Sequence, residues 1–127
     1  MVAYSFKRQF VQPIRALNKR QTMRNERKRH ARPGEILQLY TGMRTKHCRL
    51  IGTATCTAVL PVRLDFVKAR VEIGPKLRTD RLDEFAREDG FDTWPDLCAF
   101  WAREHSAIAQ WSGVLICWTD FIPAGPA

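Results

Sequence analysis

Residues 113–118 have the sequence Gly-Val-Leu-Ile-Cys-Trp, an apolar run without a polar interruption. Such a run predicts a strand, and the lack of alternation means that both of its faces must be covered. Two other segments, 36–40 and 48–59, also have strand composition. We therefore expect these three segments to be strands of one closed or nearly closed barrel.

The remaining elements follow from spacing and composition. Further strands are predicted at 2–6, 62–67 and 71–73, and a short extended segment at 19–24. Apolar residues at helical spacing predict helices over 10–17, 80–89 and 94–105. Gly52 marks a bulge or a close backbone approach. This order of elements predicts an α+β fold, built as a small β-barrel with flanking helices.

Two polar stretches are expected to stay outside the core. Residues 25–33, NERKRHARP, are predicted to form a mobile surface loop because their side chains have little apolar surface to bury. Residues 122–127 are expected to form a disordered tail. Trp94, Trp101 and Trp118 lie within apolar faces, so we assign them to the core rather than to a base-stacking platform.

The composition fits one small domain over residues 1–127, with an apolar content of 45%. The sequence has no stretch suited to a membrane span or a secretory signal, so no membrane partner is expected. The four cysteines are too sparse for a disulfide scaffold, which predicts a reduced, cytoplasmic protein. They also lack metal-site spacing, and the adjacent His47 and Cys48 are a weak metal signal, so no metal or other cofactor is expected.

Charge is distributed unevenly along the chain. Residues 1–50 hold 13 Lys and Arg against 2 Asp and Glu, a net charge of +11, whereas residues 51–127 have a net charge of −3. The basic first half favours an anionic partner, such as a phosphate-bearing molecule or RNA. The alternative is that the cluster at 27–29, Arg-Lys-Arg, only solvates a loop.

One motif and its flanking segments resemble a known family. Residues 19–24, Lys-Arg-Gln-Thr-Met-Arg, fit the pattern K-x-x-T-x-R. The other segments are SFK at 5–7, PGEIL at 33–37, LIGTA at 50–54, AREDGF at 86–91 and WSGVLI at 111–116. Together they resemble the ASCH family over residues 5–118, and the fold of that family is similar to that of PUA RNA-binding domains.

The resemblance implies an activity and a set of site residues. One type of ASCH protein is an amidohydrolase that removes the acyl group from the nucleoside 4-N-acetylcytidine. Its catalytic residues correspond here to Lys19, Thr22 and Glu88, with the Thr as nucleophile, the Lys as base and the Glu as acid or base. The substrate-binding residues, expected from their proximity to the motifs, are Ser5, Arg24 and Tyr40.

The motif makes demands on the local structure. Lys19 and Thr22 are three residues apart and would face opposite sides of an ideal strand, so a bulge or a turn must bring them together. The family usually has Gly two residues before the Lys, where this chain has Leu17. Asn18 is the candidate for supplying the unusual backbone angle instead. We expect Lys19 Nζ to lie within hydrogen-bond reach of Thr22 or of Glu88.

Three functions fit these residues: amide hydrolysis, RNA binding without catalysis, and metal-independent cleavage of RNA. A Lys can act as a base only if desolvation or nearby cations lower its pKa, whereas an adjacent carboxylate raises it. Amide hydrolysis needs a closed pocket of nucleoside size. An RNA-binding module without catalysis needs a broad basic groove, and a metal-independent ribonuclease needs a site open at both ends.

Overall fold

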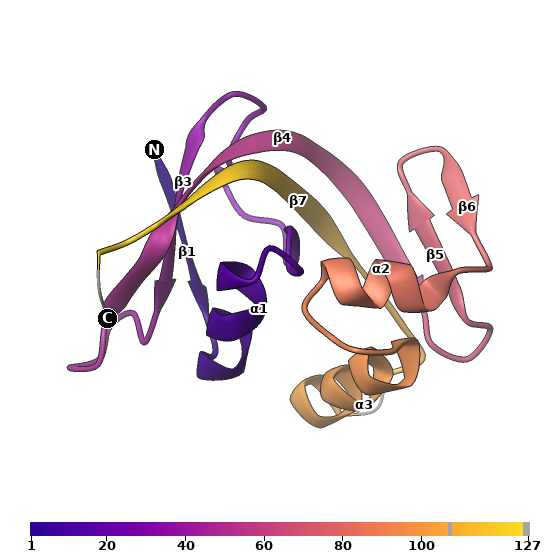
Figure 1. The fold of residues 1–127 in the computed structure, drawn as a ribbon. Helices are drawn as coiled ribbons and strands as arrows, with labels where there is room; N and C mark the ends of the chain where they lie inside the picture. The colour runs from indigo at the N-terminus through magenta and orange to yellow at the C-terminus, as the bar shows by residue number, and fades with distance from the viewer. Residues whose placement is uncertain (107, 126–127) are drawn as a thin grey trace.

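The computed structural model describes residues 1–106 and 108–125. The elements, in chain order, are β1 (Val2–Phe6), η1 (Arg8–Phe10), α1 (Val11–Arg15), β2 (Gln21–Arg24), β3 (Ile36–Thr41), β4 (Arg49–Asp65), β5 (Arg70–Ile73), β6 (Lys76–Arg78), α2 (Leu82–Glu88), α3 (Trp94–His105) and β7 (Gln110–Pro123). Figure 1 shows α1, α2 and α3 gathered below an arch formed by β4 and β7. The molecule therefore has the predicted α+β character.

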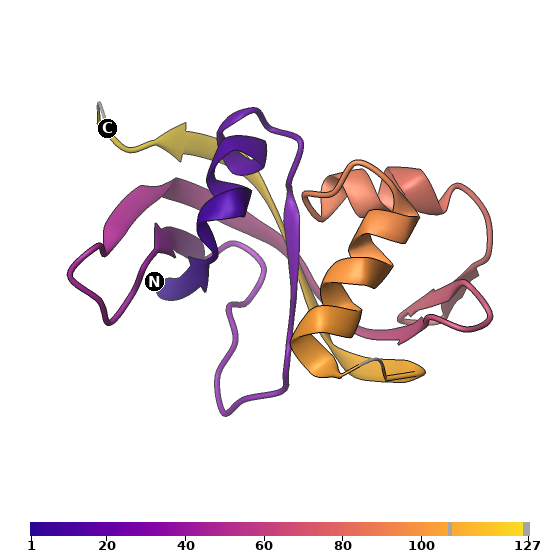
Figure 2. The ribbon, with the colours of Figure 1, turned by 90° about the horizontal axis from the view of Figure 1, so that it is seen from below.

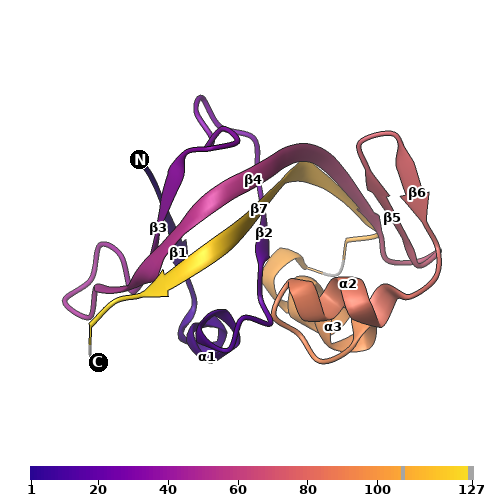
Figure 3. The same cartoon turned by 45° about the horizontal axis from the view of Figure 1, so that its top comes forward.

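The strands form one mixed sheet of seven strands. β4 and β7 pair antiparallel over most of their length and run side by side in Figure 3. The other edge of β4 pairs first with β3 and then with β5, and β6 extends β5. β1 joins β3 in parallel, and β2 joins β7 antiparallel. The predicted segments 36–40, 48–59 and 113–118 thus lie in the same sheet.

The sheet does not close, and this corrects the predicted barrel. Among the described strands, β1 pairs with β3 alone and β2 with β7 alone, so each keeps a free edge. The Arg24 guanidinium of β2 instead reaches β1, where Nη2 donates to the Ser5 carbonyl at 2.6 Å. A side chain therefore links the two edges that a backbone ladder would join in a closed barrel.

Two strands are longer than their composition predicts. β4 continues through Pro61. The residues of β4 that pair with β3 end at Thr55, and those that pair with β5 begin at Val62. Pro61 lies between these two ladders, so its missing N–H is tolerated. β7 runs to Pro123, and Ala124 N then donates to the Ile51 carbonyl at 2.9 Å. The start of the predicted tail is therefore part of the sheet, and residues 126–127 lie outside the described residues.

The basic loop at 25–33 has a buried anchor that its composition does not reveal. Ala31 is buried, and its N–H donates to the Tyr4 hydroxyl at 3.1 Å. The same hydroxyl lies 2.9 Å from Nδ1 of His30, whose ring stacks on that of Tyr4. This part of the loop is packed against β1, although Arg27, Lys28 and Arg29 are exposed as expected.

The core lies between the sheet and the helices. Its most deeply buried large side chains are Tyr4, Ile14, Leu37, Leu39, Leu64, Phe85, Leu97 and Ile116. Trp94, Trp101 and Trp118 are buried as predicted, although Trp101 also borders a cavity. Figure 2 shows β2 passing between α1 on one side and α2 and α3 on the other. None of the helices in the described part of the chain is long and apolar enough to cross a membrane.

Candidate active site

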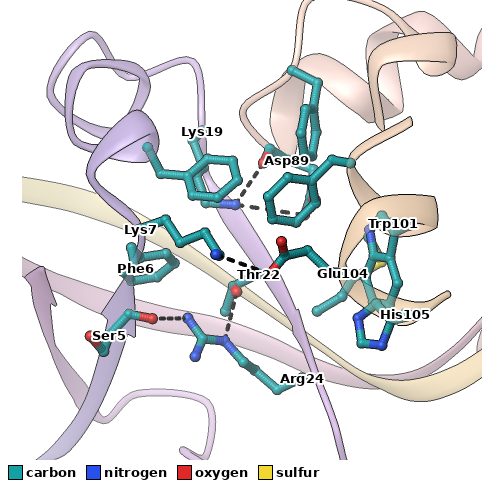
Figure 4. Close-up of a pocket in the computed structure, with 14 residues that line it drawn as sticks. Ser5, Phe6, Lys7, Lys19, Thr22, Arg24, Asp89, Trp101, Glu104 and His105 are labelled. Atoms are coloured by element: carbon teal, nitrogen blue, oxygen red, sulfur yellow. Dashed lines mark hydrogen bonds and ion pairs between the residues drawn. The ribbon is translucent and has the colours of Figure 1, made fainter. Parts of the chain in front are cut away.

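A cavity of about 200 Å³ opens between β1, β2 and α3 (Figure 4). The aromatic side chains that line it are Phe6, Phe10, Phe91, Phe100 and Trp101. The polar side chains are Ser5, Lys7, Lys19, Thr22, Arg24, Asp89, Glu104 and His105. Its volume is below the roughly 300–1,000 Å³ of pockets for drug-sized ligands, so it suits a base or an acyl amide rather than a whole nucleotide.

Lys19 is the buried cation of this cavity. Its side chain is 3% exposed, and Nζ donates to the Asp89 carbonyl at 2.6 Å. Nζ also lies 3.8 Å from the Asp89 carboxylate and 4.7 Å from the centre of the Phe10 ring. A buried ammonium group is costly without such partners, and an aromatic face adds an attraction of its own.

A turn, and not a strand bulge, brings Lys19 to the cavity. α1 ends at Arg15, and Leu17 then takes a left-handed conformation with φ of 67°. The next two N–H groups, of Asn18 and Lys19, both donate to the Pro13 carbonyl at 3.0 Å. Lys19 therefore precedes β2, and the facing rule for strands does not apply to it. The unusual backbone angle belongs to Leu17 itself, so the prediction for Asn18 is wrong.

Asp89 is the carboxylate that meets Lys19. It follows the last turn of α2 and is 5% exposed, and Gln21 Nε2 approaches its Oδ1 at 3.4 Å. Gly90 comes next with φ of 98°, a conformation that favours glycine. A Cβ at Gly90 would lie 2.9 Å from Cδ of Lys19 and 3.0 Å from Cδ1 of Phe10. Glycine is thus needed both for the backbone angle and for the approach of the Lys19 stem.

Burial lowers the pKa of Lys19 and raises the pKa of Asp89. Desolvation lowers the pKa of Lys19 from 10.5 to about 8; the Asp89 carboxylate opposes this shift and the Arg24 cation adds to it. Desolvation also raises the pKa of Asp89 from 3.8 to about 6, against the opposing effect of Lys19. At neutral pH the pair is ionised, and a modest rise in pH releases the free amine of Lys19.

Thr22 contributes a hydroxyl to the same cavity and is 4% exposed. Arg24 Nε donates to Thr22 Oγ1 at 2.9 Å, while the same guanidinium holds the Ser5 carbonyl. Because Oγ1 accepts from Arg24, its own proton is free to be donated elsewhere. Among the described residues no hydrogen bond joins Thr22 to Lys19, so any contact between them has to pass through a bound molecule or a side-chain movement.

The structure gathers only some of the expected residues. Four of them border the cavity: Ser5, Lys19, Thr22 and Arg24. The Ser5 carbonyl also accepts a hydrogen bond from Arg24. Tyr40 lies on β3, opposite Ser5 in register, and does not border it.

Glu88 also lies outside the cavity. Its side chain is 40% exposed, and its carboxylate is 3.8 Å from Nη2 of Arg20. Successive residues of a helix are turned by about 100°, so only one of two adjacent carboxylates can point at Lys19. That residue is Asp89.

Several lining residues were missed by the sequence analysis. Asp89 is one of them: the family resemblance pointed to Glu88 alone, and the carboxylate next to it is a signal that spacing alone does not distinguish from Glu88. On α3, Trp101 and His105 are four residues apart and therefore share a helix face, and their rings stack at 4.5 Å. Glu104 forms an ion pair of 3.0 Å with Lys7 across the exposed rim of the cavity. The helical spacing of α3 was a usable signal, but it does not say which face meets a cavity.

The described part of the chain has few groupings of side chains suited to a metal ion. The described residues contain no group of three or more His, Cys, Asp or Glu side chains placed to hold one. His47 and Cys48 are both exposed and lie outside the cavity. The four cysteines are free thiols.

Comparison with known proteins shows the fold. The sequence matches no family model and no curated protein. The structure is similar to the crystal structure of ASCH from Zymomonas mobilis, with a TM-score of 0.58 and 15% identity, covering 95% of this chain and 68% of that chain. Two mutant forms of the same protein give TM-scores of 0.55 and 0.58 at 13% and 14% identity, covering 95% and 98% of this chain and 70% and 71% of theirs. The chain therefore has an ASCH-type fold.

Proposed function

We propose that this ASCH-type fold carries an amidohydrolase site that removes the acyl group from 4-N-acylated cytosine nucleosides such as acetylcytidine. The observation that supports it is one aromatic-walled cavity that holds a buried lysine of lowered pKa, a buried carboxylate and a hydroxyl. Amide hydrolysis requires a base, a proton donor for the leaving amine and a nucleophile. Lys19 supplies the base and then the proton donor, Thr22 supplies the nucleophile, and Asp89 holds Lys19 in place.

In the proposed reaction, Thr22 Oγ1 attacks the acyl carbonyl while the Lys19 amine takes the hydroxyl proton, either after a side-chain movement or through a bound water. The tetrahedral intermediate then expels the 4-amino group of cytosine, which receives the proton from Lys19, and an acyl-threonine ester remains. Water attacks this ester, again with Lys19 as base, so that a carboxylic acid leaves and the Thr22 hydroxyl is restored. Arg24, which already donates to Oγ1, stabilises the negative charge that develops beside it.

Asp89 has a different part in this proposal. Its carboxylate fixes Lys19 and compensates its charge when the amine is protonated. This role falls to Asp89 instead of Glu88 because Asp89 is the buried partner of Lys19, whereas Glu88 faces Arg20 outside the cavity.

The test is turnover of 4-N-acetylcytidine, followed by the absorbance change that accompanies release of cytidine. We expect Lys19→Met and Thr22→Val each to lower kcat/KM at least about 100-fold, as loss of a base or nucleophile does, and Asp89→Asn to have a similarly large effect because Lys19 loses the carboxylate that fixes it. Each variant keeps the approximate shape of the residue it replaces. Thermal unfolding of each variant separates loss of chemistry from loss of fold.

Glu88→Gln is the matched comparison for Asp89→Asn, since each replaces one of two adjacent carboxylates by its amide. A small effect of Glu88→Gln beside a large effect of Asp89→Asn supports the assignment to Asp89. The reverse result would return the role to Glu88. Wild-type protein that releases no cytidine at all would refute the amidohydrolase proposal.

The pH profile provides an independent check of the base. If Lys19 acts as a free amine, kcat/KM increases with pH and levels off above about 8, the pKa of this residue. Asp89→Asn removes the carboxylate that raises the pKa of Lys19, so any residual activity should level off at a lower pH. A rate that decreases above pH 8 would mean that Lys19 acts as a cation.

An RNA-binding module without catalysis is the second candidate. It is favoured by an open basic groove beside the cavity, bordered by Lys7, Arg8, Lys46 and Arg49. Binding of RNA without turnover of acetylcytidine would support this candidate. RNA that is also cut would point to the ribonuclease activity instead.

A further inference from the structure

A second and larger hollow adjoins the cavity. It has a volume of about 1100 Å³ and lies between the start of η1 and the connection from β3 to β4. Ser5, Phe6 and Lys7 border both the hollow and the cavity, so the two spaces meet at the end of β1. A ligand portion held among the aromatic rings can therefore continue into the hollow, which we call the basic groove.

The charge of the basic groove has one sign. Lys7, Arg8, Lys46 and Arg49 border it, and no Asp or Glu is among the described residues that do so. Arg8, Lys46 and Arg49 are exposed, and none of them takes part in an ion pair within the described part of the chain. Lys7 alone is paired, with Glu104 on α3. Several unneutralised cations around one concave surface attract an anion of matching extent.

The basic groove also differs from the other charged part of the chain. In the loop at 25–33, Arg29 is paired with Glu35, and Arg27 lies over the Tyr4 ring. These two cations already have partners within the fold. Around the groove, by contrast, Arg8, Lys46 and Arg49 lie along one concave surface without an ion-pair partner among the described residues.

We propose that the basic groove is a phosphate subsite of the same active site, so that the substrate is a phosphorylated form of the acylated cytosine nucleoside. This inference rests on the proposed function, because it is the base in the cavity that aligns its own phosphate with the groove. Lys46 lies in the connection before β4, Arg49 is the first residue of β4, and Arg8 is the first residue of η1. The phosphate can be that of a free nucleotide or that of a single-stranded nucleic acid, since both present the same anionic oxygens to Lys and Arg.

The experiment compares three substrates with the same reacting base: 4-N-acetylcytidine, its 5′-monophosphate and a short single-stranded oligonucleotide with one acetylcytidine. We expect kcat/KM for a phosphorylated substrate to exceed that for the nucleoside at least about tenfold at 50 mM salt. This advantage should shrink at 300 mM salt because phosphate contacts weaken as salt increases. An advantage for the monophosphate identifies a free nucleotide, and an advantage for the oligonucleotide alone identifies a strand.

The double variant Lys46→Gln/Arg49→Gln should remove most of the advantage. Its control is Arg70→Gln/Lys76→Gln, which lowers the net charge equally at exposed positions of the β5–β6 hairpin. If both double variants lose the advantage equally, the attraction belongs to overall charge and the subsite is wrong. Equal kcat/KM for all three substrates in the wild type would also overturn it, while leaving the amidohydrolase proposal intact.

Calorimetric titration keeps the two proposals separable. Cytidine 5′-monophosphate and an unmodified cytosine oligonucleotide are titrated into the wild type and both double variants. If no acylated substrate is hydrolysed but these phosphates bind, and the groove variant alone loses that binding, the subsite stands and the hydrolase proposal fails. If neither phosphate binds more tightly than cytidine, the subsite is refuted whatever the turnover.

Discussion

At the scale of single residues, Leu17 has an unusual backbone conformation in the turn that leads to the site. It adopts a left-handed φ of 67° with its side chain 59% exposed, so it gains little burial in return. For a residue with a Cβ this conformation costs about 1–2 kcal/mol. The turn that it forms is nevertheless what brings Lys19 to the cavity. The chain therefore keeps the turn geometry of a glycine while carrying a leucine.

Replacing Leu17 by glycine should stabilise the protein. Relief of the left-handed strain exceeds the extra backbone entropy of glycine, roughly 0.5–1 kcal/mol, so a net gain of up to about 1 kcal/mol is expected. The measurement is the midpoint of urea unfolding. Asn18→Gly is the control because Asn18 has no left-handed φ, and it should bring no gain. A stabilising Asn18→Gly beside a neutral Leu17→Gly would contradict the structure.

The Lys19–Asp89 pair makes a prediction about stability and pH. Between pH 8 and 10.5 the unfolded chain holds a proton on Lys19 that the folded chain lacks, so stability rises with pH there. Between pH 3.8 and 6 the folded chain holds the extra proton, on Asp89, so stability falls as pH rises. The contribution of this pair is therefore least favourable between about pH 6 and 8.

The neutral double variant Lys19→Met/Asp89→Asn isolates this effect. Its stability relative to the wild type should be highest near pH 7 and should decline at pH 4 and at pH 10, as measured by urea unfolding at the three values. Single Lys19→Met leaves Asp89 buried without a partner, so it should cost about 3–5 kcal/mol at pH 7. A relative stability that is instead lowest at pH 7 would show that the pair is a net stabilising ion pair.

At the scale of elements, the strands and helices were largely predictable, whereas the site was predictable only in part. The 94–105 helix has a Thr93 cap, a proline in its first turn and a continuous apolar face, and the structure gives the same bounds. By contrast, the sequence predicts two strands, at 48–59 and 62–67, where β4 is continuous. The sequence does not show that Pro61 falls between the stretches of β4 that pair with β3 and with β5. Local patterns carry no information about which edge of a strand is paired.

The site shows the same limit. The K-x-x-T-x-R motif places Lys19 and Thr22 at one cavity, yet the carboxylate that meets them comes from the end of α2, 70 residues from Lys19. Whether Glu88 or Asp89 faces inward depends on how α2 is rotated against α3 and β2. That rotation is set by packing of Phe85 and Ala86 into the core, which the sequence indicates without fixing the angle.

The end of α2 should be sensitive to one substitution. Gly90→Ala introduces a Cβ that meets the Lys19 stem and the Phe10 ring, at a φ that alanine rarely adopts. Gly34→Ala is the matched control, because Gly34 has a similar φ of 93° but open space around its Cα. We expect Gly34→Ala to cost about 1–2 kcal/mol in thermal or urea unfolding and Gly90→Ala to cost about 1–3 kcal/mol more. Equal losses would mean that Lys19 and Phe10 move aside freely.

At the scale of the whole molecule, the outer edges of β1 and β2 have no backbone partner among the described strands, and the cavity lies between them. β1 and β2 are joined through the Arg24 guanidinium, which donates to Thr22 on one strand and to Ser5 on the other and lies 4.8 Å from the centre of the Phe6 ring. A closed ladder between these edges would fill the space that the cavity occupies. The open sheet and the candidate site are therefore two consequences of the same arrangement.

Arg24→Gln tests this bridge. The shorter amide cannot span both strands, so the Ser5 carbonyl loses a charged donor, and a loss of about 1–3 kcal/mol in the free energy of unfolding is expected. Hydrogen exchange should also quicken at backbone amides of β1 and β2, because these edges would open locally without global unfolding. Arg20→Gln is the control, since the Arg20 side chain is 60% exposed and, among the described residues, its ion-pair partner is Glu88 at 3.8 Å. If exchange at β1 and β2 is unchanged in Arg24→Gln while it quickens evenly elsewhere, the two edges are held by core packing and the guanidinium is not the link between them.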